Sequence, residues 1–232
     1  MHILLTRQLE DCSDLIFRFK ELGHIVSHLP LLDIKKIPYD SKSVDVCKSI
    51  IFTSANALKF LDIKQIDKKI KCFCVGSATE KKAKSIGFQN IITAEGNVRN
   101  LKELILQNFI PSDGNIVYVC GQLISYDLDL DLIKNGYSVT KIINYQSSHK
   151  KVFDEVFVKK LKINIPDVVY IYSYNSAQSF LNFIKNERIE SFWMNTNLMC
   201  MSEKTSSILN EIKWKKIFLF NPGEEEFLLY KI

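Results

Sequence analysis

IIFTSANALKFL (50–61) is the stretch that decides the fold, because it has a close counterpart in VVYIYSYNSAQSFLNFI (168–184). Each stretch runs from apolar residues through a serine and an asparagine into a helical spacing of apolar positions. Such a pattern is typical of a buried strand that turns directly into a helix. Its repetition predicts that the chain contains two similar α/β lobes.

Two further pairs of segments support this duplication. The segment 71–105 recurs more faintly as 197–232, and the segment 1–34 recurs as 114–147. The last pair has the order strand, helix, glycine and strand, which is a βαβ unit and requires a parallel sheet. We therefore predict an α/β fold of two similar flavodoxin-like lobes with parallel sheets.

The order of the segments leaves two domain organisations open. In one, the lobes follow each other as 1–110 and 111–232. In the other they are interleaved, with lobe one formed by 1–34 and 150–232, lobe two by 44–141, and a connecting bridge by 35–43 and 142–149. Polar, linker-like residues flank the middle block on both sides, and they favour the interleaved organisation.

The composition is that of a globular protein, with 232 residues, 47% hydrophobic and 25% charged. No apolar stretch approaches the roughly 20 residues that span a bilayer. The N-terminus lacks the pattern of a secretory signal peptide. We therefore expect a cytoplasmic location and no association with a membrane.

The charged and metal-binding residue types exclude several classes of partner. The formal net charge is +5, but the lysines are dispersed, whereas nucleic-acid-binding proteins cluster their basic residues. The six cysteines show no CxxC spacing and indicate free, buried thiols. His24 and His28 have no further ligands nearby in the sequence, so a metal site is not expected.

Hydroxyl residues recur where strands turn into helices. Ligands of doubly wound α/β sheets bind beyond the carboxyl ends of the strands, where these turns lie. The hydroxyls could cap the helices, contact a ligand, or do both. Exposed amides at helix N-termini favour anions, so we predict a polyanionic small molecule in a cleft between the lobes. The hydroxyl residues concerned are Thr53, Ser54, Thr79, Ser173 and Thr205.

Several fragments, taken in order, resemble one known family, the uroporphyrinogen-III synthases. The fragments are LLTR (4–7), IIFTSANA (50–57), VGSAT (75–79), AEGN (94–97), VYVCG (117–121), INYQ (143–146) and YSYNSAQSF (172–180). The resemblance extends along nearly the whole chain. It implies two interleaved lobes joined by a two-stranded bridge, which supports the second domain organisation.

The resemblance also implies an activity. Members of this family are lyases of tetrapyrrole (heme) biosynthesis. They cyclise the linear tetrapyrrole hydroxymethylbilane to uroporphyrinogen III, with loss of water and inversion of the last ring. No cofactor or metal takes part. The implied partners are this small-molecule substrate and, transiently, hydroxymethylbilane synthase, and we expect a monomer.

Site residues are carried over from the matching fragments. Tyr145 is the implied catalytic residue, which hydrogen-bonds the leaving hydroxyl; the alternative is a strand residue with its tip in water. Arg7 could grip a carboxylate with two hydrogen bonds, and Gly76 permits close approach of the backbone. The implied substrate-binding residues are Arg7, Thr53, Ser54, Asn56, Gly76, Ser77, Thr79, Gly96, Asn97, Gly121, Ser173, Asn175, Ser176 and Thr205.

Two departures and two alternative functions stay open at this stage. Ser202 stands where the family usually has glycine, and Gln8 replaces a common proline, so the contacts of lobe one are in doubt. A two-lobed, non-catalytic binding protein or sensor for a polycarboxylate is the main alternative. A nucleotide-dependent Rossmann enzyme is the other, but the sequence has neither GxGxxG nor GxxxxGK[ST].

Overall fold

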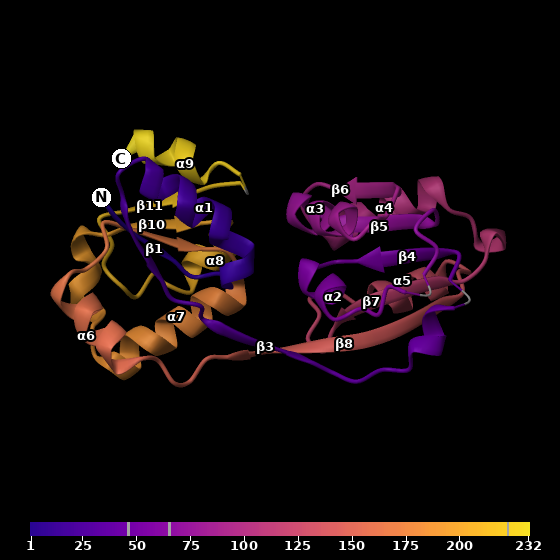
Figure 1. Cartoon of the computed structure of the whole chain (residues 1–232), viewed down its shortest axis with the longest axis horizontal. Coiled ribbons are helices and arrows are strands. Elements are labelled where there is room, and N and C mark those ends of the chain that lie inside the picture. Colours follow the sequence, from indigo (N-terminus) through magenta and orange to yellow (C-terminus); the bar gives the residue numbers. More distant parts are fainter. Residues whose placement is uncertain (46, 65, 222) are drawn as a thin grey trace. The chain divides into compact units, whose positions relative to one another are not determined.

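The computed structural model describes residues 1–45, 47–64, 66–221 and 223–232 (Figure 1). They divide into two compact units: unit 1 comprises Met1–Asp33 and Ser148–Ile232, and unit 2 comprises Ile34–Ser147. Among the described residues, no helix combines the length and the apolar character that crossing a membrane requires.

Unit 1 is built on a five-stranded sheet whose strand pairings are parallel. Counted from the β2 edge, the strand order is 2-1-3-4-5 within the unit, which is the flavodoxin-like order. The strands β9 and β10 are buried at every position, as expected for a parallel sheet covered on both faces. The strands are β1 (His2–Leu5), β2 (Ile25–His28), β9 (Val168–Ile171), β10 (Asn197–Cys200) and β11 (Lys216–Leu219).

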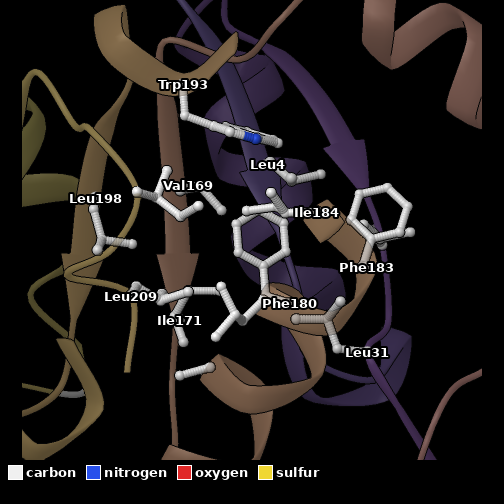
Figure 2. Packing of buried hydrophobic residues seen from close by; sticks show 14 of the residues in the cluster. Leu4, Leu31, Val169, Ile171, Phe180, Phe183, Ile184, Trp193, Leu198 and Leu209 are labelled. Atoms are coloured by element: carbon white, nitrogen blue, oxygen red, sulfur yellow. The ribbon is translucent and has the colours of Figure 1, made fainter. Parts of the chain in front are cut away.

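Helices cover both faces of this sheet. The helices α1 (Leu9–Glu21) and α9 (Glu225–Leu228) pack on one face, and α6 (Glu155–Ile163) and α7 (Tyr174–Glu187) pack on the other. The second face holds an aromatic core in which the rings of Phe180 and Trp193 meet edge to face at 5.1 Å (Figure 2). The remaining helical segments are α8 (Glu203–Ser207) and two 3₁₀ turns at Glu190–Asn195 and Leu229–Lys231.

Unit 2 has a six-stranded sheet in the order β3-β8-β7-β4-β5-β6. The strands are β3 (Leu32–Lys36), β4 (Ser49–Phe52), β5 (Lys71–Val75), β6 (Asn90–Ala94), β7 (Ile116–Gly121) and β8 (Val139–His149). The helices α2 (Ala55–Lys59) and α3 (Ser77–Ser85) share one core, and α4 (Val98–Asn108) and α5 (Leu128–Lys134) share the core of the other face. Short 3₁₀ turns occupy Ser41–Val44 and Pro111–Asp113.

The segments that repeat in the sequence occupy the same positions in the two sheets. Strands β8, β7, β4, β5 and β6 of unit 2 occur in the same order as β2, β1, β9, β10 and β11 of unit 1. The matching glycines Gly23 and Gly136 both have positive φ, +81° and +86°, immediately after the helices they follow. Glycine adopts this conformation without the steric cost of a Cβ.

The chain passes between the units twice, through β3 and β8. Lys150 N–H donates to the carbonyl of Leu31, and Ile37 N–H donates to the carbonyl of Asn144. Residue numbers increase from 31 to 37 along the first segment while their partners decrease from 150 to 144 along the second, so the two segments run antiparallel. The predicted fold class of two parallel α/β lobes, interleaved and joined by a two-stranded bridge, is confirmed.

Candidate functional site

The carboxyl ends of the parallel strands of unit 2 carry all the site residues predicted for that unit. Parallel strands bring their carboxyl ends to one edge of a sheet. Tyr145 lies on β8, Gly121 ends β7, and the other residues follow β4, β5 and β6. These other residues are Thr53, Ser54 and Asn56 after β4, Gly76, Ser77 and Thr79 after β5, and Gly96 and Asn97 after β6.

Three of these residues are in direct contact. Gly121 pairs with Tyr145 across β7 and β8. A Cβ on Gly121 would lie 2.6 Å from Cζ and 2.9 Å from the phenol oxygen of Tyr145, so the end of the ring occupies the space that a side chain would need. The side chain of Ser54 lies near enough to the Tyr145 phenol to lower its pKa.

The surroundings of Tyr145 keep its phenol protonated. Burial raises the pKa of Tyr145 above its usual value of 10.0, and the neighbouring Ser54 side chain acts in the opposite direction. Burial dominates because a phenolate loses its hydration in an apolar environment. The phenol can therefore act as a hydrogen-bond donor to a bound ligand at neutral pH.

Ser54 performs two tasks at the start of α2. Its hydroxyl oxygen accepts a hydrogen bond from Asn56 N–H at 3.3 Å, which makes it the N-cap of the helix. Asn56 contributes its backbone amide to this cap, and its side chain is half-buried. Ser54 thus links the helix start to the phenol of Tyr145.

Thr53 is not a helix cap, and the prediction that it could act as one is wrong. Its hydroxyl lies 3.3 Å from the phenol oxygen of Tyr118, a buried residue. Adjacent residues at a strand end project to opposite faces of a sheet. Ser54 therefore lies on the face covered by α2 and α3, and Thr53 lies on the face covered by α4 and α5. Tyr118 packs in the core of α4 and α5, away from the face that holds Tyr145.

The helix α3 begins without a side-chain cap. Gly76 is the N-cap and has φ +77°, and no side chain caps the first amides of the helix. Ser77 is exposed at the first helical position. Thr79 is the third helical residue and is buried, so the prediction of a capping role for Thr79 is wrong. Uncapped amides at a helix N-terminus can bind an anion.

Gly96 and Asn97 form a closed helix start instead. The side chain of Asn97 accepts from Arg99 N–H at 2.8 Å, and Asn97 N–H donates to the side chain of Asn100. Gly96 has φ +100°, and a Cβ there would lie 3.1 Å from the side-chain oxygen of Asn100. The geometry accounts for both residues by the capping box of α4.

Unit 1 places its predicted residues at the corresponding edge of its own sheet. Arg7 follows β1, and its guanidinium lies 4.8 Å from the centre of the Tyr172 ring. The ring nitrogen Nε2 of His28 donates to the Arg7 carbonyl at 2.7 Å. These contacts fix the backbone and the side chain of Arg7 beside the end of β9.

The two Ser/Thr turns of unit 1 are internally satisfied. Ser173 caps α7 by accepting from Ser176 N–H at 3.1 Å, and the two hydroxyls lie 2.9 Å apart. Ser202 and Thr205 repeat this arrangement at α8, with a separation of 3.0 Å between their hydroxyls. Thr205 is therefore the third residue of the helix, and its predicted capping role is wrong. Asn175 is exposed next to the first of these pairs.

Asn144 is a residue of this region that the sequence patterns did not single out. It is fully buried beside Tyr145, and its side-chain amide donates to the carbonyl of Ala57 in α2 at 2.7 Å. The signal that could have found it is a polar amide in the otherwise apolar run IINY (142–145). Within the described residues, no group of three His, Cys, Asp or Glu side chains is arranged to hold a metal.

Comparisons with known proteins agree with this architecture. A uroporphyrinogen-III synthetase from Helicobacter pylori superposes with a TM-score of 0.63 at 18% identity, over 100% of this chain and 99% of that one. A mutant uroporphyrinogen III synthase from the extremely thermophilic bacterium Thermus thermophilus gives a TM-score of 0.58 at 14% identity, over 100% and 97%. At these identities the likeness shows a shared fold.

The sequence itself settles the family. The comparison with curated protein sequences finds no match. The profile of the family described as uroporphyrinogen-III synthase HemD matches residues 13–219, which is most of the chain. On this match, the chain belongs to the uroporphyrinogen-III synthase family.

Proposed function

We propose that this chain converts hydroxymethylbilane into uroporphyrinogen III, as a lyase that removes water and inverts the last ring of the substrate. The observation that carries the proposal is the family match over residues 13–219. The chemistry at the carboxyl edge of unit 2 is consistent with it, because a half-buried phenol and an uncapped helix start lie along the same edge of one sheet.

The substrate carries eight carboxylates, so its binding depends on hydrogen-bond donors. We propose the first amides of α3, at Ser77 and Thr79, as one set of donors, since no side chain occupies them. Arg7 in unit 1 is the proposed charged ligand, because a guanidinium binds a carboxylate through two hydrogen bonds. The remaining candidates contribute hydroxyl or amide groups at the same two sheet edges: Thr53, Ser54, Asn56, Gly76, Gly96, Asn97, Gly121, Ser173, Asn175, Ser176 and Thr205.

Tyr145 is the proposed catalytic residue. Its protonated phenol donates a hydrogen bond to the leaving hydroxyl as the carbon–oxygen bond breaks, and the raised pKa keeps that proton available. Departure of the hydroxyl as water generates an azafulvene, which the last ring attacks through a carbon that already bears a substituent. The resulting spiro intermediate opens and recloses with that ring inverted.

Geometry is the larger contribution of the protein. In water the open chain cyclises spontaneously without inversion, so the inverted product requires the substrate to be folded into one reactive arrangement. Holding reacting groups together can supply several kcal/mol of the barrier, roughly 7–11 in well-oriented intramolecular reactions. Backbone donors suit this task, because they are positioned by the sheet and depend little on side-chain identity.

The product isomer tests this proposal. Purified protein and freshly prepared hydroxymethylbilane are expected to yield uroporphyrinogen III, measured by chromatographic separation of the oxidised isomers. The matched control is the same protein after heat denaturation, which should give isomer I at the spontaneous rate. Formation of isomer I alone by the native protein would refute the proposal and favour a non-catalytic binding protein for a polycarboxylate.

The instability of the substrate bears on partners and location. We propose a monomer in the cytoplasm that takes hydroxymethylbilane directly from its synthase in a transient contact. Direct transfer would limit spontaneous cyclisation to isomer I. The proportion of isomer III in a coupled reaction, with and without an inert competitor for the contact surface, measures this effect.

A further inference from the structure

The strand that carries Tyr145 is irregular at that residue. Cys120 of β7 pairs with Ile143 of β8, but the next residue, Gly121, pairs with Tyr145. Asn144 therefore has no residue opposite it, which is the definition of a β-bulge. A bulge changes the direction in which the next side chain points.

The bulge brings two consecutive side chains to the same face. Ile142 packs in the core that contains α2, so regular alternation would send Asn144 to that face and Tyr145 to the other. Asn144 does face that core, where it contacts Ala57 of α2. The ring of Tyr145 packs in the same core, against the alternation. Without the extra residue, Tyr145 would not face Ser54.

Asn144 lowers the stability of the fold relative to an apolar residue at this position. It is fully buried, and its Oδ1 has no hydrogen-bond partner among the described residues. Burying an unsatisfied polar atom is unfavourable, so an apolar residue would suit the core alone better. Its amide, however, ties β8 to Ala57, the third residue of the helix that Ser54 caps.

Gly121 leaves the space that the ring of Tyr145 occupies. A Cβ at this position would lie 2.6 Å from Cζ, 2.8 Å from Cε2 and 2.9 Å from the oxygen of Tyr145. Any side chain at 121 would displace the ring from Ser54. The backbone of Gly121 is not in the left-handed region, so space around the ring is the reason for glycine here.

We propose that Asn144 and Gly121 are positioning residues, which hold the Tyr145 phenol against Ser54 in the orientation used for catalysis. This inference rests on the catalytic role proposed for Tyr145. Asn144 fixes α2 and its capping serine relative to β8, and Gly121 leaves the space into which the ring closes. This role requires no contact between the substrate and the side chain of Asn144.

A double-mutant cycle with Tyr145→Phe tests the proposal. Asn144→Leu is expected to lower kcat about tenfold and to leave KM within about twofold, because it loosens one catalytic orientation while leaving the binding groups in place. In the Tyr145→Phe background, the same substitution should have no further effect on kcat. An equal fall of kcat in both backgrounds, or no fall in either, overturns the proposal.

Matched controls separate positioning from stability. Asn197 in unit 1 is another buried asparagine with an unpartnered Oδ1 among the described residues, at the amino end of β10. Asn197→Leu should change the thermal midpoint and leave kcat unchanged. If Asn144→Leu does not fold, Gly121→Ala in the same cycle decides. Gly114→Ala, just before β7, is its control for destabilisation alone, because Gly114 has φ +117° and a Cβ there would lie 2.6 Å from Cγ of Lys48.

A spectroscopic readout separates this inference from the proposed function. Nuclear magnetic resonance of ¹³Cζ-labelled tyrosine follows the titration of Tyr145, assigned by its loss in Tyr145→Phe. Asn144→Leu and Gly121→Ala should shift this titration, and Asn197→Leu should not. An unshifted titration overturns the inference even if the protein makes isomer III, whereas isomer I alone from the native protein refutes the function.

Discussion

The two units begin their helices with the same kind of turn but treat its hydroxyl groups differently. In unit 1, the capping serine and the third helical residue of α7 and α8 hydrogen-bond each other, as Ser173 with Ser176 and Ser202 with Thr205. In unit 2, Ser54 has Ala57 at the third position of α2, and its hydroxyl contacts Tyr145 instead. At the start of α3, the N-cap Gly76 has no side chain that could hydrogen-bond the third helical residue, Thr79.

This difference indicates a division of labour within one repeated motif. A hydroxyl that is paired inside its own turn stabilises the helix start and keeps fewer positions for other contacts. An unpaired turn leaves amides or hydroxyls for a ligand or for a catalytic neighbour. We infer that the turns at α7 and α8 of unit 1 contribute mainly stability and that those at α2 and α3 of unit 2 contribute mainly chemistry, whereas the start of α4 in unit 2 is closed by its own capping box.

The largest expected effect comes from removing the phenol oxygen of unit 2. Tyr145→Phe should lower kcat about 100-fold with KM within about twofold, because general acid catalysis typically contributes 10²–10⁴-fold. Steady-state kinetics of isomer III formation measure both constants. The matched variant in unit 1 is Tyr172→Phe, which removes a buried hydroxyl that has no hydrogen-bond partner among the described residues and should leave kcat unchanged.

The pH dependence follows from the same residue. Because burial raises the pKa of Tyr145 above 10.0, its acidic form predominates at every pH below that value. Ionisation of Tyr145 should therefore remove less than half of kcat up to pH 10.0, and most of the loss from this group should occur above it. A descending limb centred near neutral pH, absent in Tyr145→Phe, would contradict the assignment.

A second contrast concerns the starts of α3 and α8. Ser77→Pro removes one proposed amide donor at the first helical position, where proline is tolerated, and should raise KM about tenfold, since a hydrogen bond to a charged group contributes about 1.5–3 kcal/mol. Thr205→Val should leave KM unchanged and lower the free energy of unfolding by about 1 kcal/mol, because its hydroxyl is paired with Ser202. Equal changes of KM in the two variants would remove the contrast between the units.

The smallest effects are expected for the capping serines. Ser54→Ala and Ser173→Ala should each lower the free energy of unfolding by about 1 kcal/mol, the usual cost of losing an N-cap. Ser54→Ala should also lower kcat a few-fold, and Ser54→Thr should restore it. Urea denaturation and initial rates measure the two quantities. A loss of kcat in Ser173→Ala of the same size would show that capping alone explains the effect.

Much of the fold could be predicted because the sequence states it twice. The paired segments 50–61 and 168–184 mark strands that occupy the same place in the two sheets, β4 and β9. Gly23 and Gly136 marked the ends of helices because only glycine takes their positive φ at little cost. The apolar pattern of VDVCKSIIFTS (44–54) also predicts a strand over that whole stretch; Val46 lies outside the described residues, and β4 is shorter, at Ser49–Phe52.

The candidate site was predictable in its position but less so in its contacts. Strand ends and helix starts gave the sheet edges, while the exact capping residue depends on backbone angles that composition does not encode. The capping residue therefore lies one position after Thr53, at Ser54, and three positions before Thr79 and Thr205, at Gly76 and Ser202. The bulge at Asn144 was missed because a one-residue change of register arises from pairing between distant strands.

The insertion of unit 2 into unit 1 has a consequence for synthesis on the ribosome. The strand β1 occupies an inner position of its sheet, and its neighbour β9 is made much later, with Ile3 pairing with Val168. The inserted segment Ile34–Ser147 is complete before that partner emerges, and domains generally fold as units during translation. A nascent chain stalled after residue 147 is thus expected to hold one nearly complete sheet and one apolar strand, β1, that is paired with β2 on one side only, so the open side of β1 is the part most in need of protection by a chaperone.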